Sequence, residues 1–309
     1  MKQFFYRVFC AAAFFILIPI VFTLLFQGAG EGPFEMEEAD GTESGTEILF
    51  DEDILPGIVA NEIAIDTELE AMKAQTVIAR TNCLRAMEQG EKLPEGLTKG
   101  EMIRLWGQDN FSDYYSRIEE CISATSGVAM VNGGSYIRAD FHRSSAGYTR
   151  NAAELYGEGE YPYLKGVDSR MDIKSQDFLK VVFYTPKQLV EKGGELFGEE
   201  TRQAKDQITA AEVLGRMEVT KRDGAGYVTE VVIDGKPHSG EEVRLTYNWN
   251  SSAFSLKEVD GEIRVVTKGL GNGLGVSLFG ANELAANGYQ YKDILKYFYD
   301  GIEFVTQYH

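Results

Sequence analysis

Glu62 is the side chain whose surroundings in the sequence best suit acid–base chemistry. It stands between two apolar stretches, Ile58 to Ala60 and Ile63 to Ile65, and directly before a predicted helix. Burial of a carboxyl group among apolar neighbours disfavours its charged form and raises its pKa toward the range that a general acid needs. A helix N-terminus nearby favours the carboxylate instead. The sequence therefore leaves two interpretations open, a general acid and a solvated or helix-capping residue.

A serine nucleophile is a second chemical interpretation. Ser144 and Ser145 follow closely on Asp140 and His142, and these are the residue types of a Ser-His-Asp triad. However, the chain has no G-x-S-x-G motif, and nearness in sequence does not give triad geometry. The three histidines stand far apart, and no Cys or His pair has metal-ligand spacing. We therefore expect neither a protein metal site nor another cofactor.

Four glycines alternate with other residues in the segment 269–275. Their spacing does not fit G-x-G-x-x-G, and no Lys-Ser/Thr pair follows as in a P-loop, so a nucleotide site is not predicted. The backbone N–H groups of such a loop can approach a sugar or an anion closely. A tight packing turn explains the glycines equally well.

A helix is predicted from residue 68 to residue 87. Thr67 and Glu70 have the S/T-x-x-E spacing of a capping box, and apolar side chains follow at spacings of three and four. The residue pattern then predicts a helix over 116–124, a hairpin over 129–141, helices within 186–214, strands within 217–233, at 243–247 and at 263–266, and helices over 276–287 and 291–299. Strands and helices mix without regular βαβ units, which indicates an α+β fold around a substrate cleft.

The first 27 residues have the character of a membrane anchor. Val8 to Phe26 contains no charged residue, and a helix of that length spans most of the roughly 30 Å hydrocarbon core. Lys2 and Arg7 precede this stretch, which by the positive-inside rule places the N-terminus in the cytoplasm. A cleaved signal peptide is the alternative, and it also exports the rest of the chain. We therefore expect a single-pass membrane protein whose body lies outside the cytoplasm and faces the cell wall.

Residues 28–53 contain ten acidic residues and no basic one, which is typical of a disordered linker. The predicted domains are an anchor over 1–27, this linker over 28–53, and a body over 54–309 with a β-rich subdomain at about 185–268. The net charge of −18 argues against a nucleic-acid partner, because such binding depends on Lys and Arg. Cys83 and Cys121 form either one disulfide or two buried thiols, and the apolar helix face around Cys83 favours the thiol.

Several blocks of the body resemble one family. Residues 55–63, L-P-G-I-V-A-N-E-I, and 70–81, E-A-M-K-A-Q-T-V-I-A-R-T, are similar to G-V-V-x-x-E-M and E-A-L-K-A-Q-A-V-A-A-R-T of the stage II sporulation protein D family, which also contains an amidase enhancer. Residues 141–149, F-H-R-S-S-A-G-Y-T, with Tyr163-Leu164 behind them, resemble the family's F-H-S-S-S-G-G-x-T and Y-L. Residues 269–281 resemble its G-x-G-H-G-V-G-M-S-Q-x-G-A. The resemblance covers essentially residues 54–304.

This resemblance implies a peptidoglycan lytic transglycosylase, which cleaves glycan strands stripped of stem peptides during engulfment of the forespore. It assigns catalysis to Glu62, which protonates the leaving glycosidic oxygen and then accepts the C6 hydroxyl proton while that oxygen closes onto C1. The paired carboxylates of ordinary glycosidases are then not required. The expected partners are peptidoglycan glycan strands, the membrane, and a cell-wall amidase or other engulfment proteins.

The resemblance also implies a set of substrate-binding residues: Lys73, Gln75, Arg80, His142, Ser144, Ser145, Thr149, Asn272 and Ser277. Arg80 is expected near the cleft, because a cation among apolar residues needs a partner; a purely structural arginine is the alternative. Some family members bind zinc through extra Cys and His, but the segment 112–124 offers only Cys121, so the metal is not carried over.

Two positions depart from the family pattern. Asn272 stands where the family has His, and Leu278 stands where it has Gln. Each exchange removes a group that can hydrogen-bond a sugar. A non-catalytic glycan-binding protein that enhances an amidase therefore stays open as the alternative function.

Overall fold

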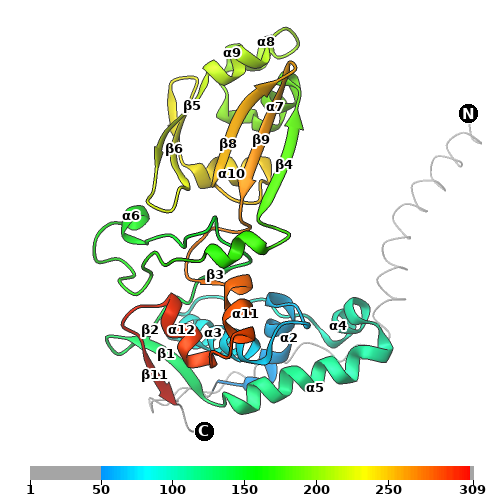
Figure 1. The fold of residues 1–309 in the computed structure, drawn as a ribbon, viewed down its shortest axis with the longest axis vertical. Coiled ribbons are helices and arrows are strands. Elements are labelled where there is room, and N and C mark those ends of the chain that lie inside the picture. The colour runs from blue at the N-terminus through cyan, green and yellow to red at the C-terminus, as the bar shows by residue number, and fades with distance from the viewer. Residues whose placement is uncertain (1–49, 307–309) are drawn as a thin grey trace, which may run out of the picture. The chain divides into compact units, whose positions relative to one another are not determined.

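The computed structural model describes residues 50–306 (Figure 1). The predicted membrane helix, Cys10 and the predicted linker as far as residue 49 lie outside this range. Within residues 50–306, no helix combines the length and the apolar character that a bilayer crossing requires. Phe50 to Asp53, which the sequence placed in the linker, belong to the folded unit, since Phe50 is buried and a 3-10 helix begins at Glu52.

The described chain mixes helices and small sheets, as an α+β fold does. The helices are η1 Glu52–Ile54, α2 Leu55–Glu62, α3 Leu69–Gln89, α4 Lys99–Trp106, α5 Gln108–Ala124, α6 Ala153–Tyr156, η2 Arg170–Lys174, α7 Pro186–Gly193, η3 Gly194–Leu196, α8 Glu199–Ala204, α9 Ala210–Gly215, α10 Gly240–Tyr247, α11 Leu278–Ala286 and α12 Tyr291–Phe298. The strands are β1 Val128–Asn132, β2 Ser135–Tyr136, β3 Phe141–His142, β4 Leu179–Tyr184, β5 Met217–Arg222, β6 Val228–Ile233, β7 Lys236–His238, β8 Phe254–Val259, β9 Glu262–Lys268, β10 Val276–Ser277 and β11 Glu303–Thr306.

These strands form four sheets. Three of them have three antiparallel strands each, in the orders β11-β1-β2, β4-β9-β8 and β5-β6-β7. The fourth is the short parallel pair β3-β10, in which Phe141 lies opposite Val276 and His142 opposite Ser277. This pair brings two of the sequence blocks, 141–149 and 269–281, side by side.

Helix α3 is the central element of the part of the fold that holds Glu62. Thirteen of its 21 residues are buried, and it contacts α2, α5, α11, α12 and β1 (Figure 1). Ala74, Val77 and Ile78 pack into one apolar cluster, while Met72 and Cys83 pack into another. The helix is thus held from both sides, which fixes the direction of every side chain it carries.

The helix at 68–87 is confirmed, but its predicted capping box is wrong. The N-cap residue is Glu68, which makes no side-chain capping bond. Its backbone N–H instead donates to Asn282 Oδ1 of α11 at 2.8 Å. Glu70 accepts from Lys73 Nζ and from the backbone N–H of Tyr291. A tertiary contact therefore replaces the local cap, because α11 and α12 pack against the start of α3.

Three other local predictions need correction. Helix α5 begins at Gln108 rather than at residue 116. The hairpin turns at Gly133 and Gly134 as predicted, but its second strand ends at Tyr136, and the segment at 141 pairs with β10 instead. Residues 243–247 lie in helix α10, not in a strand; Ser239 caps this helix by accepting from the backbone N–H of Glu242.

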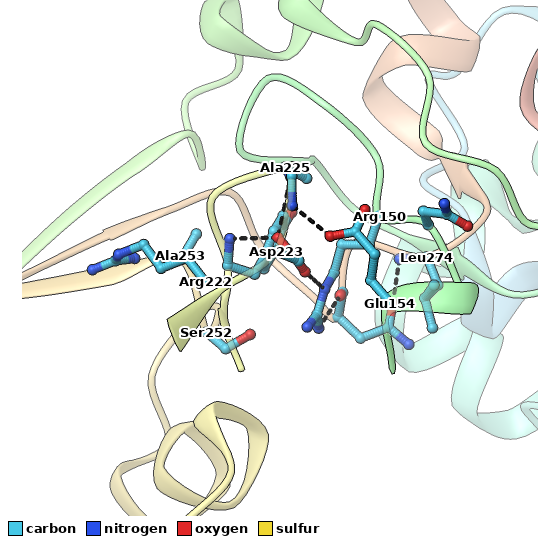
Figure 2. A network of polar contacts seen from close by, with 12 residues as sticks. Arg150, Glu154, Arg222, Asp223, Ala225, Ser252, Ala253 and Leu274 are labelled. Carbon is cyan, nitrogen blue, oxygen red and sulfur yellow. Dashed lines mark hydrogen bonds and ion pairs between the residues drawn. The ribbon is translucent and has the colours of Figure 1, made fainter. Parts of the chain in front are cut away.

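A separate apolar cluster consists of buried side chains from the sequence range 184–265. Its members come from β4, α7, β6, α10, β8 and β9, among other elements. Buried Arg150 joins this part to the glycine-rich loop (Figure 2). Its Nε donates to Asp223 Oδ2 at 2.6 Å, and its Nη1 donates to Glu241 Oε1 and to the backbone oxygen of Asn272. A buried cation with several partners fixes the relative placement of the three segments that supply them.

The glycine-rich loop 269–275 is a packing turn. A Cβ atom on Gly275 would lie 1.8 Å from the backbone oxygen of Asp140, and one on Gly271 would lie 2.6 Å from His142 Cβ. Both residues also have positive φ, at +65° and +118°. Glycine is therefore required here so that the loop can lie against β3, which bears out the structural interpretation of the motif.

Candidate active site

Glu62 is the last residue of α2 and lies at the wall of a cavity of about 380 Å³. That volume falls in the range of small-molecule sites, roughly 300–1,000 Å³. The other walls come from the loop after α2, from Arg143 with the segment 175–177, and from α11. A larger hollow of about 600 Å³ lies between Pro56, Leu97 and Phe111, but Glu62 does not line it. The cavity beside Glu62 is therefore the candidate active site.

Gln75 of α3 is the hydrogen-bond partner of Glu62. Its Nε2 donates to Glu62 Oε2 at 2.8 Å, and its side chain is buried. The Oε1 atom of Gln75 is buried as well and has no hydrogen-bond partner among the described residues. The amide can therefore hold a carboxylate through Nε2, and a rotation of the amide would present Oε1 to a protonated carboxyl group.

Burial raises the pKa of Glu62 to about 7, and the hydrogen bond from Gln75 opposes part of that rise. Desolvation disfavours the charged form because the apolar surroundings cannot replace its hydration. Glu62 also stands at the C-terminal end of α2, where the helix dipole disfavours negative charge. The sequence had suggested the opposite helix end, because α2 was not predicted. The sequence left open whether burial or the nearby helix end dominates the pKa of Glu62. In the structure both effects raise this pKa, so the carboxyl group exchanges its proton near neutral pH.

Lys73 and Arg80 do not line this cavity. Lys73 Nζ pairs with Glu70 on the same helix at 2.6 Å. Arg80 is buried, with 1% of its side chain exposed, and its guanidinium donates to Glu52, to Thr125 Oγ1 and to the backbone oxygen of Val128. Arg80 does have the partner that a buried cation needs, namely Glu52 of η1. Together with the bond to Val128 of β1, this contact connects η1 and β1 to α3. Its position supports the structural interpretation of this arginine.

The block 141–149 lies beside the cavity, but its predicted ligands are buried. His142 Nδ1 hydrogen-bonds the backbone oxygen of Leu274, and burial lowers the pKa of His142. Ser145 Oγ accepts from the backbone N–H of Gly147, and Thr149 Oγ1 accepts from that of Val167. Ser144 Oγ is buried without a hydrogen-bond partner among the described residues. The hydrogen bonds of His142, Ser145 and Thr149 stabilise the loop, and none of the four side chains lines the cavity.

A serine triad is not formed by these residues. His142 Nε2, like Ser144 Oγ, is buried without a hydrogen-bond partner in the described part of the chain. A base must lie within hydrogen-bond reach of the nucleophile that it activates. The structure therefore brings Ser144 and His142 into the same core without the contact that a serine hydrolase requires.

Asn272 and Ser277 are also structural in position. Asn272 Oδ1 accepts from the backbone N–H of Leu274 within the glycine-rich loop. Ser277 is buried and caps α11 by accepting from the backbone N–H of Gly280. Leu278, the other departure from the family pattern, does line the cavity. An apolar side chain thus faces the cavity where the family pattern has an amide.

Two residues that matter to the site were not singled out from the sequence. Arg143 lines the cavity and lies 3.5 Å from Asp177. Asp172 is buried and accepts from the backbone N–H of Ser145 and from the hydroxyls of Ser169 and Ser277. Arg143 could have been noticed inside the block 141–149, but Asp172 stands in no motif. Its carboxylate connects the blocks 141–149 and 269–281, through Ser145 and Ser277, and these blocks are brought together only by the fold.

No group of three His, Cys, Asp or Glu residues with metal-binding geometry occurs between residues 50 and 306. Cys83 and Cys121 are free, buried thiols, which agrees with the thiol interpretation. Burial raises the pKa of Cys83 to about 12 and that of Cys121 to about 11. Neither thiol is then a thiolate nucleophile at neutral pH.

Comparison with known proteins agrees with the sequence blocks. A family model described as stage II sporulation protein matches residues 41–132. Stage II sporulation protein D of Bacillus amyloliquefaciens is 30% identical over 267 residues, which cover 82% of this chain and 73% of that protein. Stage II sporulation protein D of Bacillus subtilis is also 30% identical, with the same coverage of both chains. The amidase enhancer of Bacillus subtilis is 23% identical over 80% of this chain and 39% of its own length. The chain therefore belongs to the stage II sporulation protein D family.

Proposed function

We propose that this protein is a lytic transglycosylase that cleaves peptidoglycan glycan strands at the cavity beside Glu62. The observation that carries the proposal is the pKa of Glu62, raised to about 7 by burial at the wall of an open cavity. A group with such a pKa holds a proton for the leaving group and releases it at neutral pH, which is the property that general acid catalysis requires.

The proposed reaction uses one carboxyl group twice. Protonated Glu62 donates its proton to the glycosidic oxygen as the bond from that oxygen to C1 breaks. The resulting carboxylate then takes the proton of the C6 hydroxyl of the same sugar while that oxygen bonds to C1. The 1,6-anhydro sugar leaves, and Glu62 is protonated again. Gln75 serves both states, because its Nε2 stabilises the carboxylate and its unpaired Oε1 can accept from the carboxylic acid.

An amidase-enhancing, non-catalytic protein is the second candidate. The supporting observation is Leu278, an apolar side chain at the cavity wall where the family pattern has a glutamine. The relative named amidase enhancer supports the same alternative. In this case the cavity would bind glycan strands without cleaving them, and a cell-wall amidase would be the partner.

We further propose that the N-terminal segment anchors the protein in the membrane with its body facing the cell wall, during sporulation. The uncharged stretch from Val8 to Phe26 and the two cations before it support this placement. The same proposal includes an anchor over 1–27 and a linker that follows it and ends before the folded body, which already includes Phe50 to Asp53. Protease protection of the tagged N-terminus, with digestion of the body in intact spheroplasts, is the expected result.

The decisive experiment incubates the purified chain with glycan strands from which the stem peptides have been removed. We expect 1,6-anhydro-muramyl products, detected by mass spectrometry, and a loss of about a hundredfold or more in Glu62→Gln. Glu262→Gln, at an exposed position of β9, is the control and should retain full activity. Anhydro products from folded Glu62→Gln at the wild-type rate would exclude the mechanism, and strand binding without any product would select the enhancer.

A further inference from the structure

Arg143 carries the only positive charge among the residues that line the cavity beside Glu62 in the described chain. The other ionisable lining residues are Glu62, Asp66 and Asp177. With Glu62 protonated, the cavity wall holds two carboxylates and one guanidinium. An anionic group of a ligand is then repelled from most of the wall and attracted at one point.

The backbone of Arg143 is fixed, whereas its side chain is open to solvent. Its N–H donates to the backbone oxygen of Leu270 at 3.0 Å, and its carbonyl oxygen accepts from the N–H of Phe279 at 3.0 Å. The side chain is 64% exposed. The guanidinium is thus attached at a rigid position between the glycine-rich loop and α11, and it remains free to meet a ligand.

Asp177 leaves the N–H donors of the Arg143 guanidinium free for a ligand. The approach of Arg143 Nη2 to Asp177 Oδ2 is 3.5 Å, and the Asp177 side chain is 42% exposed. None of the described residues forms a hydrogen bond with the guanidinium. A solvent-exposed ion pair of this kind contributes little stability, so the five N–H donors of the guanidinium are available.

We infer that Arg143 binds a carboxylate of the saccharide, so that the site selects glycans whose sugar carries a free acid. A guanidinium binds a carboxylate through two parallel hydrogen bonds, which fixes orientation as well as charge. In peptidoglycan this group is the lactyl carboxylate of muramic acid, which is free only where no peptide is attached. The inference rests on the proposed glycan substrate, and it makes Arg143 a specificity-determining residue.

The test compares two preparations of the same denuded strands. One keeps its lactyl carboxylates, and in the other they are converted to methylamides with a carbodiimide and methylamine. The wild-type chain should cleave the acid strands about tenfold faster than the amide strands, as expected for the loss of a charge-assisted hydrogen-bonded pair. Arg143→Gln should reduce this preference to within about twofold by slowing only the acid strands. Arg143→Lys should keep part of it.

Arg170→Gln is the matched control, because Arg170 is also exposed (66%) and paired with an aspartate but does not line the cavity. It should retain the wild-type preference. Equal cleavage of both strands by the wild type, or an equal loss on both strands in Arg143→Gln, would overturn the inference.

Strand binding separates this inference from the proposed reaction. Co-sedimentation of Glu62→Gln with each strand preparation measures recognition without turnover. If the wild type yields no anhydro product, the proposed reaction fails, but preferential binding of the acid strands that Arg143→Gln abolishes still supports Arg143 as the carboxylate ligand. If both strand preparations bind equally, the assignment of Arg143 fails whatever the outcome of the cleavage assay.

Discussion

Gln75 Nε2 lies 2.8 Å from Glu62 Oε2, and this hydrogen bond connects the central helix α3 to the end of α2. The two residues are thirteen positions apart in the sequence, on separate helices. The bond orients the carboxyl group at the cavity wall, and it opposes the rise in pKa that burial causes. The position and the acidity of the proposed catalytic group therefore both depend on one buried amide.

Replacement of Gln75 by leucine should shift the pH dependence of cleavage. The donor that stabilises the Glu62 carboxylate is lost, so the pKa of Glu62 should rise above about 7. The alkaline limb of the rate profile should move to higher pH, and the maximal rate should fall because the carboxyl group is less well oriented. Gln203→Leu is the matched control, since Gln203 Nε2 also donates to a glutamate, Glu199, but at the exposed surface. An unchanged alkaline limb in Gln75→Leu would contradict this account.

The stability of the protein should depend on pH through Glu62. Its pKa is about 7 in the folded state against an ordinary value of 4.5, so the folded state binds the proton more tightly than the unfolded state does. The stabilisation is complete below pH 4.5 and is lost as the pH rises through 7, by on the order of 3 kcal/mol. Relative to Glu62→Gln, which does not titrate, the wild type should therefore lose stability between pH 4.5 and pH 8. Urea unfolding of both proteins at each pH measures this difference, and a constant difference would argue against a buried titrating carboxyl group.

Arg80→Met should lower stability without removing the chemistry. The change leaves the Glu52 carboxylate without the guanidinium that it contacts at 2.6 Å, and the loss of one partner of a buried pair costs about 3–5 kcal/mol. Since Arg80 does not line the cavity, kcat/KM per folded molecule should stay within about twofold of the wild type. A tenfold loss in kcat/KM for folded Arg80→Met would instead place this residue at the substrate.

Gly275→Ala should be among the most destabilising single changes in the loop. The added Cβ would meet the backbone oxygen of Asp140 at 1.8 Å, in addition to the strain of alanine at a φ of +65°. Gly261→Ala is the matched control, because Gly261 has a φ of +82° and its Cβ would meet nothing within 4 Å. The control should lose about 1–2 kcal/mol, the cost of the left-handed conformation, and Gly275→Ala should lose clearly more in thermal or urea unfolding. Equal losses would mean that the loop can move away from β3.

The sequence alone determined the features that depend on local pattern. The periodic apolar residues of 68–87 predicted α3, because an amphipathic repeat forms the same helix wherever it is packed. The apolar residues that adjoin Glu62 in the chain indicated desolvation of its carboxyl group, although the sequence left a solvated or helix-capping glutamate open as the alternative. The sequence blocks, which occur in the same order as in the family, predicted the family. A relative that is 30% identical over 82% of this chain confirms that prediction.

The tertiary structure alone decided which of the predicted residues meet at the cavity. Gln75 meets Glu62, whereas Arg80, His142, Ser144, Ser145 and Thr149 are buried in the core. The side-chain partners of Arg80, His142 and Thr149 lie far along the chain from them. The cavity itself combines α2, Arg143, the segment 175–177 and α11. Short-range propensity contains no information about such contacts, because a side chain's neighbours across the fold are set by how whole helices and strands pack, and a buried polar group takes whichever partner that packing supplies.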